Sequence, residues 1–352
     1  MSEDLKNMLK PILKHIGVTR ISNITGYEDK IIHVFQSVRP SGQHLIVDSG
    51  KGTDKISAFI SCAVESIERY AAEFHTDKGE TISYQLLPLI LQNENDKLFS
   101  IEKIKAVKGQ CLNNNKSIWL PKDLIDYKNK TSDVLNIKKF FCGTTGLGAH
   151  TDRELAIYSG LIEVLERDAI AENRANYILN LNSIPKDLQT YIDWINENVG
   201  KIEIRLHQSS YGVFVFSCYC INKELIGGLN SMGACVDKHS ALKICLIEGI
   251  QTWLMRISAS RDDWYFAKRS IYNNLSQSPH QVNYQDIDDH TATKSIYDRK
   301  INLVRSIKSA FVYDYKTKVS IDPIKVVRVI IPKTKKLEQG EMFTGIPRGS
   351  IK

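Results

Sequence analysis

The 352-residue chain lacks the features of a membrane or secreted protein. No apolar run approaches the roughly 20 residues that cross a bilayer. The N-terminus begins Met-Ser-Glu-Asp-Leu-Lys and is charged where a signal peptide is apolar. We therefore expect a cytoplasmic protein without a membrane partner. The net charge of +7 is also small for this length, so we expect no nucleic-acid partner.

The chain also lacks the spacings of common metal and phosphate motifs. Its cysteines include no C-x-x-C pair and its histidines no H-x-x-x-H pair, which argues against structural zinc. We interpret the cysteines as reduced, buried thiols, with a soft-metal site at Cys218 and Cys220 as the alternative. No G-x-x-x-x-G-K-[ST] sequence is present, so the chain is not a P-loop protein.

What the chain does have is one pattern that occurs twice: Ser, three residues, Glu, two residues and Glu-Arg. The two copies cover residues 61–69 and 159–167. Each follows a glycine-bearing segment, 50–52 or 143–148, which we expect to be a loop. Because residues three and four apart share one face of a helix, each copy predicts a helix with a Ser, two Glu and an Arg on one side.

These two helix faces suggest a metal site. Their four glutamates would repel one another if the faces met, unless a hard divalent cation such as Mg²⁺ lay between them. The four are Glu65, Glu68, Glu163 and Glu166. The alternative is that glutamates of each helix form exposed ion pairs with its own arginine. Lys51 is a candidate for binding phosphate at the helix N-terminus behind the first glycine turn, or else a solvated lysine.

Hydrophobic periodicity and turn residues predict the secondary structure. The expected helices cover 3–16, 54–74, about 143–173 together with its glycine loop, and 238–258. The expected strands cover 31–38, 44–47, 116–120 and 324–332, with a hairpin at 202–222 and a loop-rich stretch at 264–300. We predict a mixed α/β (α+β) fold, one large domain over 1–352 with internal duplication of glycine loop–helix units. Its parts are expected at about 17–140, 141–263 and 264–352.

In their order along the chain, the motifs resemble the signatures of the YcaO family. The first combines Gly50-Lys51-Gly52 with Ser61, Glu65, Glu68 and Arg69. The second combines Thr145-Gly146-Leu147-Gly148 with residues 163–169. The third combines Glu248 and Gln251 with Arg261-Asp262-Asp263. The resemblance extends from about residue 17 to 332 and implies a YcaO-like fold.

The resemblance implies an ATP- and Mg²⁺-dependent enzyme that acts on a backbone amide of a ribosomally made peptide or a protein. In such a reaction the amide oxygen is phosphorylated, a nucleophile attacks the activated carbon, and phosphate leaves. Sulfide as nucleophile gives a thioamide, a Cys, Ser or Thr side chain gives an azoline, and an amine gives an amidine. No general base stands out in the sequence.

The resemblance also implies roles for individual residues. The positions that match the family's magnesium-holding carboxylates are Glu65, Glu68, Glu163 and Glu166. The positions that match its nucleotide-binding residues are Ser61, Arg69, Arg167, Glu248 and Gln251, with Lys51 and Arg261 as further candidates.

Two departures from the family bear on the product and on activity. The chain ends with a single proline in its tail, Pro347, where the azoline-forming branch is proline-rich, and this favours a thioamide. Ala149-His150-Thr151 replaces the frequent Ala-Gly-Asn, so the alternative is an ATP-binding scaffold that presents a peptide to a partner enzyme without its own turnover. The family implies a TfuA-like or a leader-binding E1-like partner protein. Apolar helix faces at 3–16 and 238–258 would allow a homodimer.

Overall fold

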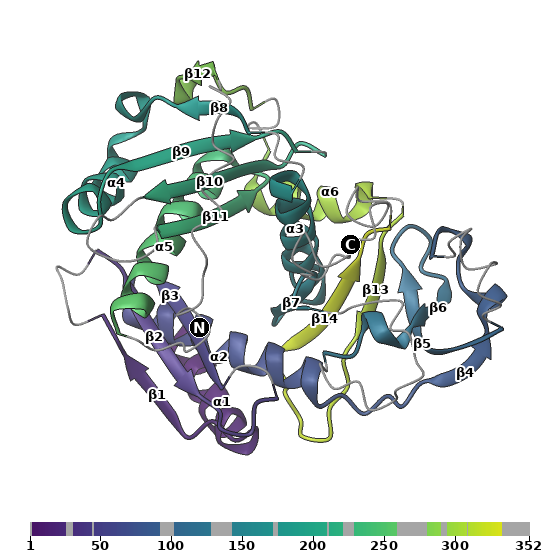
Figure 1. The fold of residues 1–352 in the computed structure, drawn as a ribbon. Coiled ribbons are helices and arrows are strands. Elements are labelled where there is room, and N and C mark those ends of the chain that lie inside the picture. The colour runs from purple at the N-terminus through teal and green to yellow at the C-terminus, as the bar shows by residue number, and fades with distance from the viewer. Residues whose placement is uncertain are drawn as a thin grey trace, which may run out of the picture.

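Three sheets are arranged in a ring whose inner side carries the helices α2 (Lys55–Glu73), α3 (Arg153–Ala171) and α5 (Lys238–Ile257) (Figure 1). This computed structural model describes residues 2–25, 31–43, 46–91, 102–127, 143–171, 175–209, 211–220, 229–258, 280–289, 294–307 and 309–332. No helix within these ranges is long and apolar enough to span a membrane.

The sheets differ in size and are largely antiparallel. The first contains, in order, β1 (Arg20–Asn23), β2 (His33–Val38) and β3 (Val47–Gly52). The second contains β11 (Leu229–Cys235), β10 (Phe214–Cys220), β9 (Ile202–His207), β8 (Ala175–Leu179) and, parallel to β8, β12 (His280–Val282). The third contains β4 (Glu80–Ser83), β5 (Lys103–Cys111), β13 (Phe311–Asp314), β14 (Lys325–Ile330) and β7 (Leu147–His150), with β6 (Ser117–Pro121) paired to β5.

A strand followed by a helix that packs on it occurs three times, as β3–α2, β7–α3 and β11–α5. Each of these strands is the terminal strand of its sheet. Each helix also contacts the strand of another unit: α2 contacts β7, α3 contacts β11, and α5 contacts β3. The three units therefore close into a ring. The remaining helices pack on them from outside, α1 (Ser2–His15) on α2, α4 (Lys186–Asn198) on α5 and α6 (Ile296–Ser306) on α3.

One glycine in each strand allows its helix to approach closely. A Cβ added to Gly50, Gly148 or Gly233 would lie 1.9, 2.1 or 2.3 Å from a backbone atom of the following helix. Four residues after each glycine, an aspartate precedes the helix and accepts hydrogen bonds from its first N–H groups, as N-cap residues do. These aspartates are Asp54, Asp152 and Asp237.

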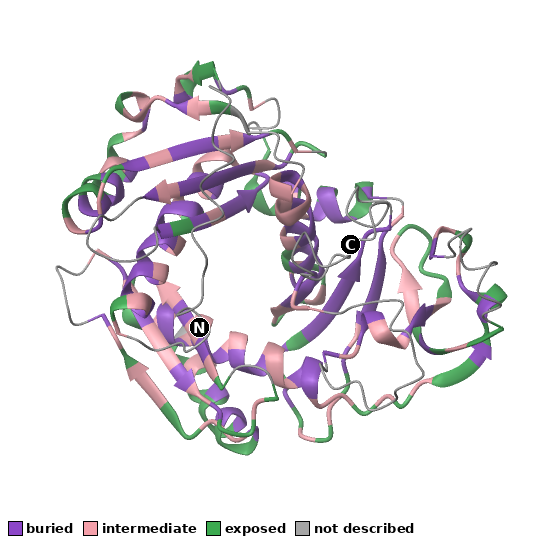
Figure 2. Cartoon of the chain, in the orientation of Figure 1, coloured by how far each residue is buried: buried purple, intermediate pink, exposed green. Residues whose placement is uncertain are grey.

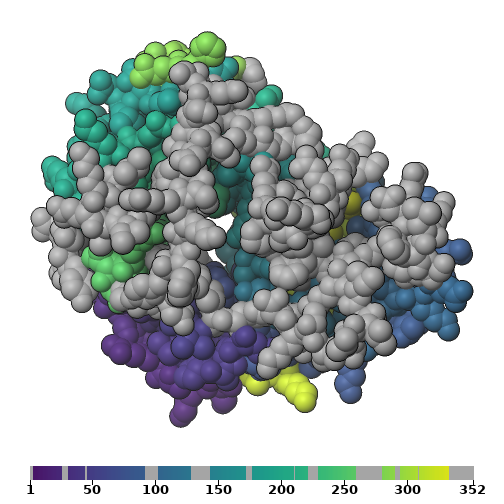
Figure 3. Space-filling view, viewed as in Figure 1, coloured from purple at the N-terminus to yellow at the C-terminus, as the bar shows by residue number. Residues whose placement is uncertain are grey.

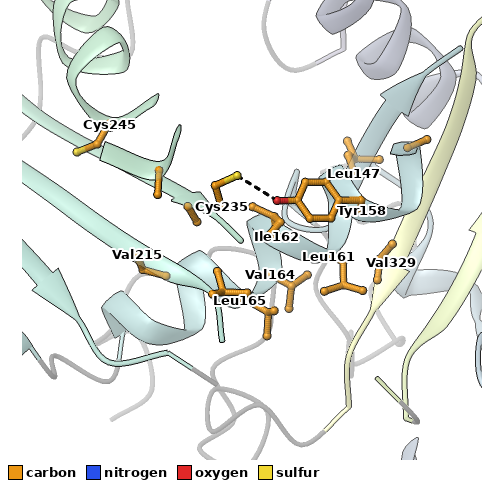
Figure 4. Close-up of a cluster of buried hydrophobic side chains, with 14 of the residues drawn as sticks. Leu147, Tyr158, Leu161, Ile162, Val164, Leu165, Val215, Cys235, Cys245 and Val329 are labelled. Carbon is orange, nitrogen blue, oxygen red and sulfur yellow. Dashed lines mark hydrogen bonds between the residues drawn. The ribbon is translucent and has the colours of Figure 1, made fainter. Parts of the chain in front are cut away.

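Helix α3 lies at the centre of the hydrophobic core, between two sheets. It contacts β7 and β14 on one side and β10 and β11 on the other. Leu161 faces Val329 of β14, whereas Leu165 lies on the side of Val215 of β10 (Figure 4). The Tyr158 hydroxyl donates to Cys235 Sγ of β11 at 3.4 Å. Buried residues follow the strands beside these helices, and exposed residues gather at the outer rim (Figure 2).

Most of the predicted elements are present, but one prediction about the glycines is wrong. The helices expected at 3–16, 54–74 and 238–258 are α1, α2 and α5, and the hairpin at 202–222 is β9–β10. The glycine segment at 50–52, however, lies within β3 rather than in a loop, and residues 147–148 begin β7. Helix α4 was not predicted, and the loop-rich stretch at 264–300 includes β12 and the start of α6.

Three further expectations concern the organisation of the chain. The internal duplication stays a prediction, while the structure shows three units with matching packing. The division at 17–140, 141–263 and 264–352 also stays a prediction, and the third sheet contains strands from all three parts. The apolar face of α1, including Leu9 and Leu13, is buried in the core, as is that of α5. A homodimer therefore stays a prediction that these faces do not support.

Candidate functional site

The three inner helices carry polar side chains at matched positions. Fifteen and eighteen residues after its strand glycine, each helix has one pair: Glu65 and Glu68, Glu163 and Glu166, and Glu248 and Gln251. Residues three apart lie on one face of a helix, and each helix contacts the strand of another unit around the ring. Figure 3 shows a hollow near the centre of this face of the molecule.

The first glutamate of each pair has a basic partner. The pairs are Glu65–Arg69 at 2.6 Å, Glu163–Arg167 at 2.5 Å and Glu248–Lys51 at 2.9 Å between nitrogen and oxygen. In α2 and α3 the partner is four residues further along the same helix, as the alternative sequence interpretation expected. The pairs are not fully exposed, however, because Glu65 and Glu163 keep only 34% and 27% of their side-chain surface in contact with solvent.

Asp48 of β3 is a second partner of Arg69. Its side chain is buried, and its Oδ1 lies 3.0 Å from Arg69 Nε. Burial raises the pKa of Asp48 to about 6, and the nearby charge of Arg69 opposes this shift. Arg69 is thus held between Asp48 and Glu65, which fixes the direction of the Glu65 carboxylate. Sequence reasoning missed Asp48, although an acid directly after an apolar strand run was a usable signal.

In α3 the corresponding arginine is held by the turn before β7. Arg167 donates a hydrogen bond to the hydroxyl of Thr145, and the N–H of Gly146 donates to Glu163 Oε2 at 2.9 Å. Arg328 of β14 is buried and donates to the carbonyl of Thr145 at 2.7 Å, which fixes the turn. Sequence reasoning also missed Arg328. An arginine inside an apolar strand signals a buried polar partner.

The second glutamates of α2 and α3 hold their protons strongly. Burial raises the pKa of Glu166 to about 8, and the charges of Glu248 and Glu163 act in the same direction. Burial likewise raises the pKa of Glu68 well above its usual range, with contributions from Glu65 and Glu163. Because carboxylates on one helix shift the pKa of those on another, the acidic groups of α2, α3 and α5 lie close enough to interact electrostatically.

The donor chemistry of this site fits Mg²⁺ bound together with a nucleotide. Within the described ranges, no three His, Cys, Asp or Glu side chains form a ready-made metal cluster. Mg²⁺ uses few protein carboxylates and completes its octahedron with water and phosphate oxygens, so carboxylates on separate helices meet its needs. A cation between them would also relieve the repulsion that helps to raise the pKa of Glu68 and of Glu166.

Two side-chain contacts join α5 to β3. Lys51 Nζ contacts Glu248 Oε2, and Gln251 Nε2 donates to Ser49 Oγ, each at 2.9 Å. Lys51 therefore lies in a strand beside α5. The prediction that it stands at a helix N-terminus is wrong, because α2 begins only after its N-cap residue Asp54.

The other predicted residues have simpler outcomes. Ser61 lies one turn before Glu65 on α2 and is half-buried. Arg261 lies outside the described residues. Cys218 and Cys220 are buried free thiols, as expected, and burial raises the pKa of Cys220 to about 11 and that of Cys218 further. Protonated thiols are poor metal ligands, which argues against the soft-metal alternative.

Known proteins share this architecture and a family description. A family model described as "YcaO cyclodehydratase", binding ATP and Mg²⁺, matches residues 49–335. The structure of YcaO from Methanopyrus kandleri bound with AMPPCP and Mg²⁺ has a TM-score of 0.75 and 21% identity, covering 99% of this chain and 95% of that one.

Two further similar proteins are informative. The E. coli microcin synthetase McbBCD complex with pro-MccB17 bound has a chain with a TM-score of 0.65 and 15% identity, covering 89% of this chain and 87% of that one. A protein of Rhizobium leguminosarum bv. trifolii known as "Uncharacterized protein in tfuA 3'region" is 23% identical, over 77% of this chain and 69% of its own length.

Proposed function

The chain belongs to the YcaO family, and we propose that it activates a backbone amide of a peptide or protein by phosphorylating the amide oxygen. ATP and Mg²⁺ are the cofactors of this family. The observation that carries the proposal is the meeting of the acidic faces of α2 and α3 with Glu248 of α5. A site with this many carboxyl groups on three helices suits Mg²⁺, which in turn binds nucleotide phosphates.

We propose the following division of roles. The residues that hold Mg²⁺ are Glu65, Glu68, Glu163 and Glu166. The residues that contact the nucleotide are Ser61, Arg69, Arg167, Glu248 and Gln251, with Lys51 and Arg261 as further candidates. Bound Mg²⁺ supplies charge neutralisation on the phosphates. Arg69 and Arg167 hold the first glutamates in place, supported from behind by Asp48 and by the turn that Arg328 fixes.

In the proposed reaction the amide oxygen takes the terminal phosphoryl group of ATP, and ADP leaves. A nucleophile then adds to the amide carbon, and the phosphorylated oxygen departs as phosphate. An amide is a poor electrophile, so conversion of its oxygen into a leaving group supplies the missing driving force. The protein contributes positioning and a charged environment, which are the main needs of phosphoryl transfer.

We propose a thioamide as the product, with sulfide as the nucleophile and a TfuA-like protein as partner. The relative in a tfuA region supports this choice. An azoline or amidine product, with a leader-binding E1-like partner, is the competing outcome. The microcin synthetase with bound pro-MccB17 supports a peptide substrate in either case. A cytoplasmic location, where ATP is available, completes the proposal.

The first test is binding of AMPPCP with Mg²⁺, measured by calorimetry. We expect Glu68→Gln to weaken binding at least about tenfold, because a carboxylate that faces the cation is lost. Glu154→Gln is the matched control, since Glu154 is an exposed residue in the first turn of α3. Absence of binding by the wild-type protein would contradict the proposal.

The second test uses ATP, Mg²⁺, sulfide and a candidate peptide encoded beside the gene. Phosphate release and the mass of the peptide are measured together. Exchange of one oxygen for sulfur supports the thioamide, and loss of one water supports a ring or an amidine. Binding of nucleotide without turnover would favour the alternative function, a scaffold that presents a peptide to a partner enzyme.

A further inference from the structure

The third strand–helix unit takes its basic residue from a different place than the other two. In α2 and α3, an arginine four residues after the first glutamate neutralises it at 2.6 or 2.5 Å. The equivalent position of α5 is Thr252, which has no charge. Glu248 contacts Lys51 of β3 instead, at 2.9 Å. All three first glutamates therefore have one cationic partner, but only the third is supplied by another unit.

The contact between α5 and β3 differs from the other units in a second residue. The second position of the pair is a carboxylate in α2 and α3 but an amide in α5, where Gln251 donates to Ser49 at 2.9 Å. Ser49 and Lys51 are the residues on either side of the β3 glycine. At the equivalent places β7 has Leu147 and Ala149, which cannot form such bonds. The contact of α5 with β3 therefore includes two side-chain bonds, Glu248–Lys51 and Gln251–Ser49, at strand positions where β7 has apolar residues.

We propose that Lys51 is a positioning residue that replaces the missing arginine of the third unit and holds Glu248 in the site. It joins segments 197 residues apart and so fastens the last unit of the ring to the first. The pair is partly exposed, with 25% of the Lys51 and 41% of the Glu248 side chain open to solvent. Its effect on global stability is accordingly small, and its effect on the direction of Glu248 is the larger one.

This inference deepens the proposed function and rests on it for the binding measurement. A direct phosphate contact by Lys51 is the competing explanation. Moving the positive charge from β3 to α5 distinguishes this explanation from a positioning role. Thr252→Arg restores in α5 the arginine that α2 and α3 carry, at a position that is half-exposed. An arginine there reaches Glu248 along one helix turn but leaves β3 without its charge.

The experiment compares Lys51→Met, Lys51→Met with Thr252→Arg, and Lys55→Met as a control that removes an exposed charge nearby. Calorimetry with AMPPCP and Mg²⁺ is the main measurement. We expect Lys51→Met to bind about tenfold more weakly, Thr252→Arg to restore most of this loss, and Lys55→Met to bind as wild type does. Unchanged binding by Lys51→Met, or a loss that Thr252→Arg does not restore, overturns the proposal.

A measurement without nucleotide keeps this proposal separate from the proposed function. In buffer with EDTA, we expect Lys51→Met to lower the midpoint of thermal unfolding by about 1–2 °C and Thr252→Arg to restore it. If the wild-type protein binds no nucleotide, the proposed function is wrong, but this comparison still tests the pair. Equal midpoints for wild type and Lys51→Met would show that the pair does not fasten the ring.

Discussion

Helices α3 and α5 occupy equivalent places in the ring and differ at two neighbouring positions, where α3 has Glu166 and Arg167 and α5 has Gln251 and Thr252. Each has a glutamate fifteen residues after its strand glycine, and three residues later α3 has Glu166 where α5 has Gln251. Gln251 hydrogen-bonds to Ser49, whereas burial and neighbouring carboxylates raise the pKa of Glu166. The same backbone arrangement thus places a hydrogen-bonded amide in one unit and a buried carboxyl group in the other. The side chain at this position, and not the fold of the unit, therefore distinguishes the proposed Mg²⁺ ligand Glu166 from Gln251, which joins α5 to β3.

Replacing Glu166 of α3 by the glutamine that α5 carries should have the largest effect on activity. We expect Glu166→Gln to lower ATP-dependent phosphate release about 100-fold or more, because an amide cannot replace a carboxylate beside a cation. Thermal stability without Mg²⁺ should not fall, since a buried acid that repels its neighbours is removed. Phosphate release and the unfolding midpoint are measured on the same samples.

Glu154→Gln provides the matched control for that change. It makes the same chemical substitution on the same helix, at an exposed glutamate outside the proposed site. We expect it to release phosphate at the wild-type rate. If Glu166→Gln were as active as Glu154→Gln, the two positions in α3 and α5 would have equivalent roles and the comparison would be wrong.

A smaller effect tests whether the three units are equivalent in packing. A Cβ on Gly50, Gly148 or Gly233 would overlap the backbone of the following helix. We expect each Gly→Ala substitution to lower the free energy of unfolding by about 1–3 kcal/mol, as overpacking does. Urea unfolding followed by circular dichroism measures it.

Gly249→Ala is the control for the packing test. An added Cβ there would meet the Leu229 and Ser231 side chains at 3.1 Å rather than backbone, and alanine favours the helix. We expect its stability to stay near that of the wild type. Tolerance of alanine at one strand glycine alone would show that its unit packs differently from the other two.

The sequence predicted the acidic faces of α2 and α3 because local spacing determines them. It did not predict that α5 is a third unit, since Gln251 and Thr252 break the Glu-Glu-Arg pattern, although the spacing of the glycine, the aspartate and the first glutamate persists. The glycines themselves were assigned to loops because isolated glycine disfavours strands. Close contact with a helix outweighs that preference, and contacts of this kind are not visible in local sequence.

The residues that support the site were missed for a related reason. Arg328 is bonded to Thr145 across 183 residues of sequence, so no local pattern connects them. Asp48 contacts Arg69, for which the sequence suggested only the nucleotide or Glu65 as a partner. Supporting residues of this kind depend on sheet order and on the packing of helices, and those follow from tertiary structure rather than from periodicity.

The smallest expected effect compares α3 with α5 through pH. The folded state raises the pKa of Glu166 from 4.5 to about 8, so folding favours its protonated form. The stabilising contribution of that proton is complete below about pH 4.5 and is lost as the pH rises through about 8. In EDTA, the unfolding midpoint of the wild type should therefore fall more steeply between pH 5 and pH 8 than that of Glu166→Gln.

Mg²⁺ with AMPPCP should reverse the sign of this difference. A cation binds the ionised carboxylate, so its stabilising effect on the wild type should grow over the same pH range and stay small in Glu166→Gln. Gln251→Ala should leave the pH slope of the wild type unchanged, because an amide does not titrate. Parallel pH curves for wild type and Glu166→Gln would mean that this glutamate is already ionised in the folded protein, and that α3 differs from α5 by less than the structure indicates.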